Sequence, residues 1–189
     1  MPSYQDALDL FHEWTVTDSL RRHGYVVEAA MGFYAEHYGE DVETWRMAGL
    51  LHDIDYEKHQ TLEEHPYVGV AMLREKGYPE DILEAIMGHA NHTNTPRTTL
   101  LARVLFAVDE LAGFIMAVGY VRPTGLEGMS PKSVTKKLKD KPFAAAVSRE
   151  DVRNGAADLG IELNQHIAHV ISGMQRDATR LGFDSSDKG

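Results

Sequence analysis

The chain has 189 residues, 43% of them apolar and 25% charged, which is typical of a soluble globular protein with a single core. Its 19 basic and 29 acidic residues give a formal net charge of −10, which argues against non-specific binding to nucleic-acid polymers or acidic membranes. Cysteine is absent, so thiolate chemistry is excluded and a metal site must use the 10 histidines with carboxylates. We expect a cytoplasmic protein, because the N-terminus shows no secretory signal and the longest apolar run is too short to span a bilayer.

Apolar residues recur at helical spacing along most of the chain, and no segment shows the alternation of a strand. Helices are predicted over residues 6–16, 18–39, 42–52, 61–76, 79–89, 98–118, 148–159 and 161–181. Residues 122–142 are rich in proline, glycine and lysine and predict a basic loop with a short helix. The pattern indicates an all-α protein with a helical core over residues 1–121. Residues 122–189 are predicted to pack on this core as part of the same structural domain.

The dipeptide His52-Asp53 directly follows an apolar run, where a predicted helix ends. Adjacent side chains in a regular helix project about 100° apart and do not converge. At the end of a helix the backbone can turn both inward, so that an imidazole nitrogen and a carboxylate oxygen bind one divalent ion. The alternative is an exposed pair at a helix end, which the dipeptide alone favours.

Asp109 lies on the apolar stripe of the helix predicted over residues 98–118, whereas Glu110, one step round, can face solvent. A buried carboxylate without a partner costs several kcal/mol, so Asp109 must be protonated, paired with an arginine or bound to a metal. His166 and His169 share a face of the last predicted helix, but no carboxylate is placed beside them. A solvent-facing pair is the simpler interpretation there.

The order His23, His52-Asp53, Asp109 resembles the H…HD…D motif of the HD-domain superfamily of metal-dependent phosphohydrolases, over residues 18–120. The resemblance implies an HD-domain helical bundle with a small C-terminal helical extension, in which these four residues are the metal ligands. It also implies an enzyme that hydrolyses phosphoester or phosphoanhydride bonds in a small nucleotide or phosphorylated metabolite, using a metal-activated water. The donor types suit Mn, Fe, Mg, Ni, Co or Zn and do not choose among them.

Further histidines raise the question of a second metal ion. His65, before a proline, is similar to the His-Pro segment of the binuclear HDIG-type branches, and His89 and His92 resemble their later histidines. These three residues are the predicted second set, with His89 favoured over His92 and Asp53 able to bridge two ions. The alternative is that they are polar residues at helix ends. Asp55 stands where the HDIG pattern has glycine, which weakens any inference from its cyclic-dinucleotide phosphodiesterase branch.

Charged residues after the HD pair are candidates for proton transfer and phosphate binding, although a solvated position is the alternative for each. The predicted catalytic set is Asp53, Asp55 and Glu57, because a carboxylate at the mouth of the site could orient water or move a proton. The predicted phosphate ligands are Lys58, Arg122, Lys136 and Lys137.

Two other functions stay open at this stage. One is an HD-type di-iron oxygenase, which the additional histidines would serve. The other is a non-catalytic HD module that binds nucleotides. The expected partner is a small phosphorylated molecule and not a nucleic-acid polymer or a membrane. A homodimer is compatible with an acidic helical chain of this size.

Overall fold

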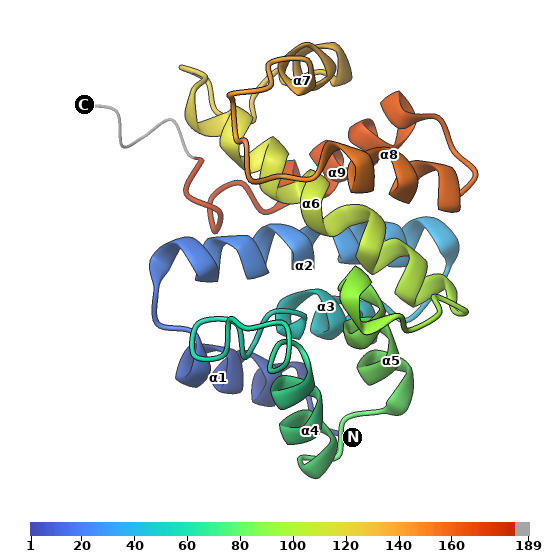
Figure 1. Ribbon diagram of the computed structural model, residues 1–189. Coiled ribbons are helices and arrows are strands. Elements are labelled where there is room, and N and C mark those ends of the chain that lie inside the picture. The colour runs from blue at the N-terminus through green and yellow to red at the C-terminus, as the bar shows by residue number, and fades with distance from the viewer. Residues whose placement is uncertain (184–189) are drawn as a thin grey trace.

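The computed structural model describes residues 1–183, which form nine α-helices and one short 3-10 helix without a strand (Figure 1). The prediction of an all-α protein is confirmed. The elements are α1 (Tyr4–Trp14), α2 (Asp18–Tyr38), α3 (Val42–Leu51), α4 (Tyr67–Glu75), α5 (Glu80–His89), η1 (Asn91–Thr93), α6 (Leu100–Tyr120), α7 (Pro131–Leu138), α8 (Arg149–Asp158) and α9 (Leu163–Arg176). Within the described residues, no helix is both long and apolar enough to cross a membrane.

The segment between α3 and α4 differs most from the sequence prediction. A helix was expected from residue 61, but α4 begins only at Tyr67. Pro66 has no N–H group to donate and restricts the backbone of the residue before it, so a helix cannot run through this point without disruption. Residues 52–66 instead form successive turns, which leaves several polar side chains on irregular backbone beside the helices.

Helices α2 and α3 pack side by side and run in opposite directions. The first, α2, ends at Gly39, whose φ of 72° lies in the left-handed region that glycine adopts without strain. Asp41 then caps α3 by accepting a hydrogen bond from the N–H of Thr44 at 2.8 Å. A Cβ atom at Gly49 would lie 3.0 Å from the Cα of Glu28, so a glycine here allows the backbones to approach closely. The start of α2 and the end of α3 therefore lie together.

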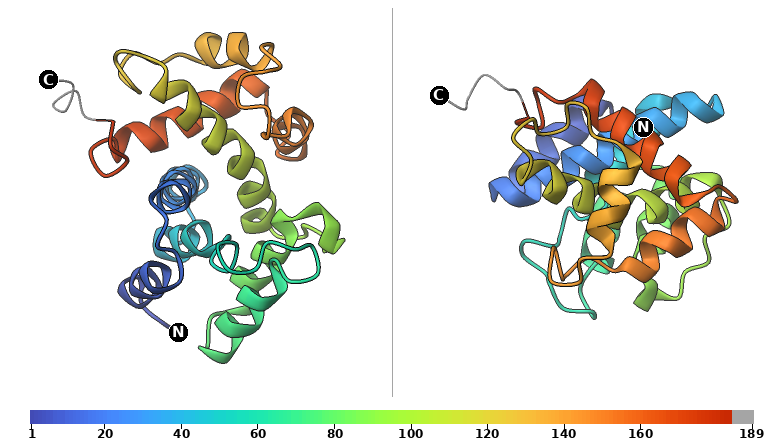
Figure 2. Two further views of the ribbon diagram at one scale, coloured as in Figure 1. Left: turned by 60° about the vertical axis from the view of Figure 1, so that its left-hand side comes forward. Right: turned by 90° about the horizontal axis from the view of Figure 1, so that it is seen from above.

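The remaining large helices pack around α2 and α6. Helix α2 lies between α3 on one side and α6 and α9 on the other, and α6 crosses α2 obliquely (Figures 1 and 2). Helix α8 packs directly on α6, because a Cβ atom at Gly155 would lie 2.5 Å from the Cα of Ala107. Helices α8 and α9 thus pack against the central pair of α2 and α6.

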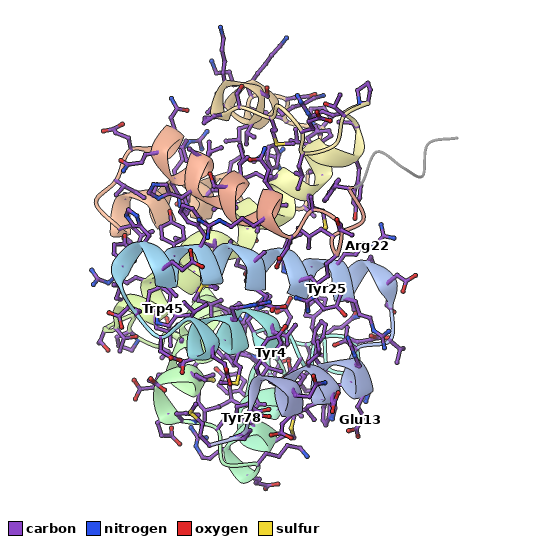
Figure 3. All side chains as sticks on the ribbon, turned by 180° about the vertical axis from the view of Figure 1, so that it is seen from behind. Tyr4, Glu13, Arg22, Tyr25, Trp45 and Tyr78 are labelled. Carbon is purple, nitrogen blue, oxygen red and sulfur yellow. The ribbon has the colours of Figure 1, made fainter. Side chains whose placement is uncertain are left out.

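A buried carboxylate ties the N-terminal helix to the rest of the fold. Glu28 is fully buried in α2, and its Oε1 accepts hydrogen bonds from the Tyr4 hydroxyl at 2.5 Å and from Nη2 of Arg46 at 2.6 Å. Its Oε2 lies 2.9 Å from Nη1 of Arg180. The network therefore joins Tyr4 of α1, labelled in Figure 3, to α2, α3 and the segment after α9.

Candidate metal centre

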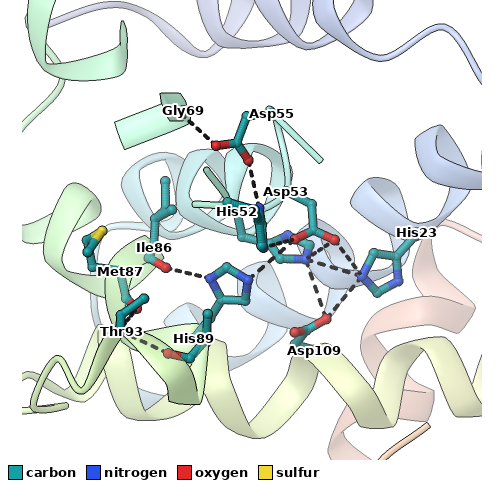
Figure 4. Close-up of polar contacts among 12 residues, drawn as sticks. His23, His52, Asp53, Asp55, Gly69, Ile86, Met87, His89, Thr93 and Asp109 are labelled. Atoms are coloured by element: carbon teal, nitrogen blue, oxygen red, sulfur yellow. Dashed lines mark hydrogen bonds and ion pairs between the residues drawn. The ribbon is translucent and has the colours of Figure 1, made fainter. Parts of the chain in front are cut away.

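Three side chains from three helices converge at the centre of the fold. His23 projects from α2 and Asp109 from α6, and His52 is the C-cap residue that directly follows α3. The Nε2 atom of His23 lies 3.0 Å from Oδ1 of Asp109 and 3.2 Å from Nε2 of His52 (Figure 4). His52 Nε2 lies 3.4 Å from the same carboxylate oxygen. The three ligand atoms lie within 4.8 Å of one another, a spacing at which they can share one metal ion.

A second group of side chains converges beside the first. His65 lies at the end of the turn segment before α4, and His89 is the last residue of α5. Their Nε2 atoms both lie 3.4 Å from Oδ1 of Asp53. The other oxygen of the same carboxylate, Oδ2, lies 3.4 Å from Nε2 of His52 and 3.7 Å from Nε2 of His23. Asp53 therefore presents one oxygen to each cluster.

Hydrogen bonds behind the rings orient three of the histidines. Nδ1 of His52 lies 2.7 Å from the carbonyl oxygen of Gly49, and Nδ1 of His89 lies 2.5 Å from that of Ile86. A carbonyl oxygen only accepts, so both Nδ1 atoms donate and each Nε2 atom of the neutral ring keeps its lone pair for the cluster. His65 is held in the same way by the carboxylate of Asp55. This donor set, with its orientation fixed from behind, fits divalent metal ions.

The electrostatics of the centre also favour bound cations. Burial lowers the pKa of His52, but Asp53 and Asp109 outweigh burial and hold that pKa well above its ordinary value. Burial raises the pKa of Asp109, yet His52 and His23 hold it well below its usual range. The side chains of Asp53 and Asp109 are only 24% and 19% exposed. Ionised carboxylates at this depth need positive charge beside them. A proton on His52 supplies it, and divalent ions at the same ligand atoms would supply it in place of that proton.

Two of the predicted site residues support the second cluster from outside it. Asp55 is buried; its Oδ1 accepts from Nδ1 of His65 at 2.7 Å and its Oδ2 from the N–H of Gly69 at 2.7 Å. His92 donates from Nε2 to the backbone carbonyl oxygen of His65 at 2.8 Å, because a carbonyl cannot donate. Its Nε2 is used there, whereas that of His89 faces Asp53.

The other predicted residues lie away from the centre. Glu57 accepts hydrogen bonds from the backbone N–H groups of Val16 and Thr17 and so fixes the start of α2. Lys58 places its ammonium group over the ring of Trp14, 4.5 Å from the ring centre. The remaining predicted phosphate ligands, Arg122, Lys136 and Lys137, line a separate pocket of about 460 Å³ beyond the end of α6. Arg122 follows Asp109 by a helical distance of about 20 Å, which accounts for the separation.

The metal centre forms the floor of a pocket of about 560 Å³. Sequence reasoning missed several of its walls, because they come from elements that meet only in the folded chain. Glu110 does not simply face solvent: it lines the pocket, and its Oε2 accepts from the N–H of Ser148 at 3.1 Å. Burial and the neighbouring Asp109 raise the pKa of Glu110 to about 7. Asp151 of α8 lines the same pocket.

This helical bundle with its His/Asp clusters has the fold of a metal-dependent phosphohydrolase of the HD type. Residues 22–113 match the family model of the HD domain, and this part of the chain is an HD domain. The matched range includes every member of both candidate clusters, from His23 to Asp109.

Among curated proteins, the chain is similar to several named ribonuclease Y. It is 30% identical over 105 residues to ribonuclease Y of Nitratidesulfovibrio vulgaris, a match that covers 55% of this chain and 20% of that protein. The match to the Desulfotalea psychrophila protein is 31% over 120 residues, covering 63% and 21%. The match to the Thermus thermophilus protein is 34% over 92 residues, covering 48% and 16%. This chain therefore spans about a fifth of the length of these distant homologues, and the similarity is to their HD domain. The comparison with solved structures gave no significant match.

Proposed function

We propose that this protein holds two divalent metal ions and hydrolyses phosphoester or phosphoanhydride bonds in a small nucleotide or phosphorylated metabolite. The observation that carries the proposal is the carboxylate of Asp53. Its Oδ1 forms one cluster with His65 and His89, and its Oδ2 faces His52 of the other cluster. A carboxylate that faces two clusters in this way is suited to bridging two ions.

The six proposed ligand residues divide between the two metal ions. His23, His52 and Asp109 would hold one ion together with Oδ2 of Asp53. His65 and His89 would hold the other with Oδ1 of Asp53. Divalent ions held in this way lower the pKa of a bound water and stabilise negative charge that develops on a phosphoryl oxygen.

The surrounding chain orients this centre and limits its contact with solvent. The Nδ1–H groups of His52 and His89 are held by backbone carbonyls, so these rings cannot rotate without losing a hydrogen bond. Apolar side chains, including Leu20, Phe106 and Val147, also line this pocket and make part of its wall unfavourable for water. A phosphorylated molecule entering this pocket would meet the ligand atoms of both clusters on its floor.

The expected substrate is a small molecule and not a nucleic-acid polymer, because the chain carries a net charge of −10. The matched relatives are named ribonucleases, so a short single-stranded RNA belongs in the substrate panel beside nucleotides and phosphorylated metabolites. Cleavage of the RNA with higher kcat/KM than any small substrate would contradict this part of the proposal.

The first test is metal content. Elemental analysis of protein purified without added metal should give about two ions per chain, and Asp53→Ala should lose both ions together with hydrolytic activity. His59→Ala is a matched control, since His59 pairs with Glu64 at 3.2 Å and belongs to neither cluster. Full activity in Asp53→Ala would contradict the proposal.

A di-iron oxygenase is the second candidate, and the same six-residue set of four imidazoles and two carboxylates supports it, because iron accepts these donors. Protein purified anaerobically would then contain two irons per chain and consume oxygen in proportion to substrate loss. Iron-free protein that hydrolyses phosphoesters excludes this candidate.

A further inference from the structure

The basic residues that line the metal pocket are histidines. Among the described residues of its wall, none is a lysine or an arginine. Arg97 contacts the wall residue Phe106, with its guanidinium 3.4 Å from the ring centre, but does not line the pocket. Its Nε donates to the carbonyl oxygen of Gly88 at 2.7 Å and its Nη2 to Oδ1 of Asn91 at 2.5 Å, so this guanidinium is already bound to the protein. Sites that bind multiply charged phosphates usually add lysine or arginine to the metal ions.

The same pocket carries two carboxyl groups beyond those of the metal clusters. Glu110 projects from α6 and Asp151 from α8. Oδ1 of Asp151 accepts from Nδ2 of Asn91 at 3.1 Å, and Asn91 also lines the pocket, so Asp151 is held at this wall. Together with Asp53 and Asp109, these carboxylates offset the positive charge of two divalent ions. A ligand that enters the occupied site meets little net positive charge.

We infer that the substrate is a phosphodiester, with a single negative charge at the scissile phosphorus, and not a phosphomonoester or a polyphosphate. The inference rests on the proposed function and narrows its substrate class. Each additional negative charge on a phosphoryl group would be repelled by Asp151 across a partly buried pocket, where charges are weakly screened. A phosphodiester carries one negative charge at neutral pH, whereas a phosphomonoester carries close to two.

The apolar part of the pocket wall also favours a phosphodiester substrate. Leu62 is 64% exposed and Tyr56 is 37% exposed where the turn segment borders the pocket. Phe106 and Val147 line the pocket from α6 and from the segment before α8. A phosphodiester has a second ester group that can cover these side chains and remove them from water, whereas a phosphomonoester has none.

The test compares two synthetic esters with the same leaving group, bis(para-nitrophenyl) phosphate and para-nitrophenyl phosphate, at about pH 8, where the monoester is a dianion. The metal-loaded wild type should show a kcat/KM for the diester at least about tenfold above that for the monoester. Asp151→Asn should raise kcat/KM for the monoester by roughly three- to tenfold and leave the diester within about twofold. Glu150→Gln is the matched control, because Glu150 neighbours Asp151 on α8 but does not line this pocket.

The outcomes separate this inference from the proposed function. A higher kcat/KM for the monoester overturns the inference and leaves a phosphohydrolase. Equal effects of Asp151→Asn and Glu150→Gln on the monoester also overturn it, since the charge of the pocket wall would then have no local role. Failure of the protein with two bound ions to hydrolyse either ester, nucleotides or phosphorylated metabolites contradicts the proposed function itself, and the inference with it.

Discussion

Asp55 accepts a hydrogen bond from Nδ1 of His65 at 2.7 Å, and the N–H of Gly69 holds its second oxygen at the same distance. This carboxylate stands where the HDIG pattern has glycine. It lies behind the second cluster and does not line the pocket. It is therefore a positioning residue. It selects the tautomer of His65 in which Nε2 has a free lone pair, and it increases the basicity of the ring.

The role of Asp55 leads to a first prediction. Asp55→Asn keeps the size of the side chain but replaces the ionised acceptor with a neutral amide. The affinity for the second ion should fall by roughly 10- to 100-fold, whereas the first ion, held through His23 and Asp109, should stay within about threefold. Metal titration in a competing chelator measures both affinities. Equal weakening of the two ions would indicate general damage to the fold instead.

A second prediction concerns the histidines of the second cluster. His65→Ala should reduce the metal content from two ions per chain to one and lower kcat by at least about a hundredfold, because one cation no longer stabilises the transition state. His92→Ala should retain both ions, since His92 donates to a backbone carbonyl and its ring faces neither cluster. Elemental analysis of both variants measures the number of ions per chain. Loss of an ion in His92→Ala would make it a ligand.

The sequence predicted the helices and the order of the candidate ligands because both are local properties. Helical spacing is a property of neighbouring residues, and His52, Asp53 and Asp109 are recognisable from their positions at a helix end and on an apolar stripe. The different roles of His89 and His92 could not be predicted in this way, because they depend on contacts between segments that are distant in the sequence. Both lie near the end of α5, and only the packing of that end against the turn segment sends one ring to Asp53 and the other to the His65 carbonyl.

Long-range packing also explains the errors around the pocket. Glu110 was expected to face solvent because its own helix places it beside the apolar stripe, but the segment before α8 covers that side of α6. The sequence favours a solvent-facing position for His166, but the side chain is fully buried. Its Nε2 donates to the carbonyl oxygen of Ala107 at 2.8 Å, and its Nδ1 therefore accepts from the Tyr34 hydroxyl at 2.5 Å. Neither partner is near His166 in the sequence.

Buried His166 gives a third prediction, on stability against pH. Burial lowers its pKa to about 4, so the unfolded chain binds this proton more readily than the folded one. Stability should therefore be complete above about pH 6.5 and decline as the pH falls toward 4, with about 3 kcal/mol at most from this residue. Urea unfolding at several pH values should show a shallower decline in His166→Gln. An unchanged slope would exclude His166 as its source.

A fourth prediction separates stability from metal binding. Glu28→Gln removes the charge that Arg46 and Arg180 share in a buried position. Two guanidinium groups would then lack their common counter-ion, and the free energy of unfolding should fall by about 2 to 4 kcal/mol. Chemical denaturation measures the loss, and metal content should be unaffected because none of these residues belongs to a cluster. The exposed pair Arg74–Glu80 offers a control, where Glu80→Gln should cost under about 1 kcal/mol.

The last prediction concerns the wall formed by residues 140–147. Arg149 donates to the backbone carbonyl oxygens of Phe143, Ala144 and Val147, and one guanidinium thus fixes a segment with no helix of its own. Ala144 and Val147 line the metal pocket, whereas Arg149 does not. Lysine has one donor group where arginine has a planar fork, so Arg149→Lys should loosen this wall. KM should rise by roughly three- to tenfold, with both ions retained and kcat within about twofold, because the wall contacts substrate and not the metal ligands.

Steady-state kinetics and metal analysis of Arg149→Lys test this prediction. Arg153→Lys is the control, because Arg153 lies one turn further along α8 and outside the metal pocket. A fall in metal content in Arg149→Lys would show that the segment supports the metal centre as well as the wall.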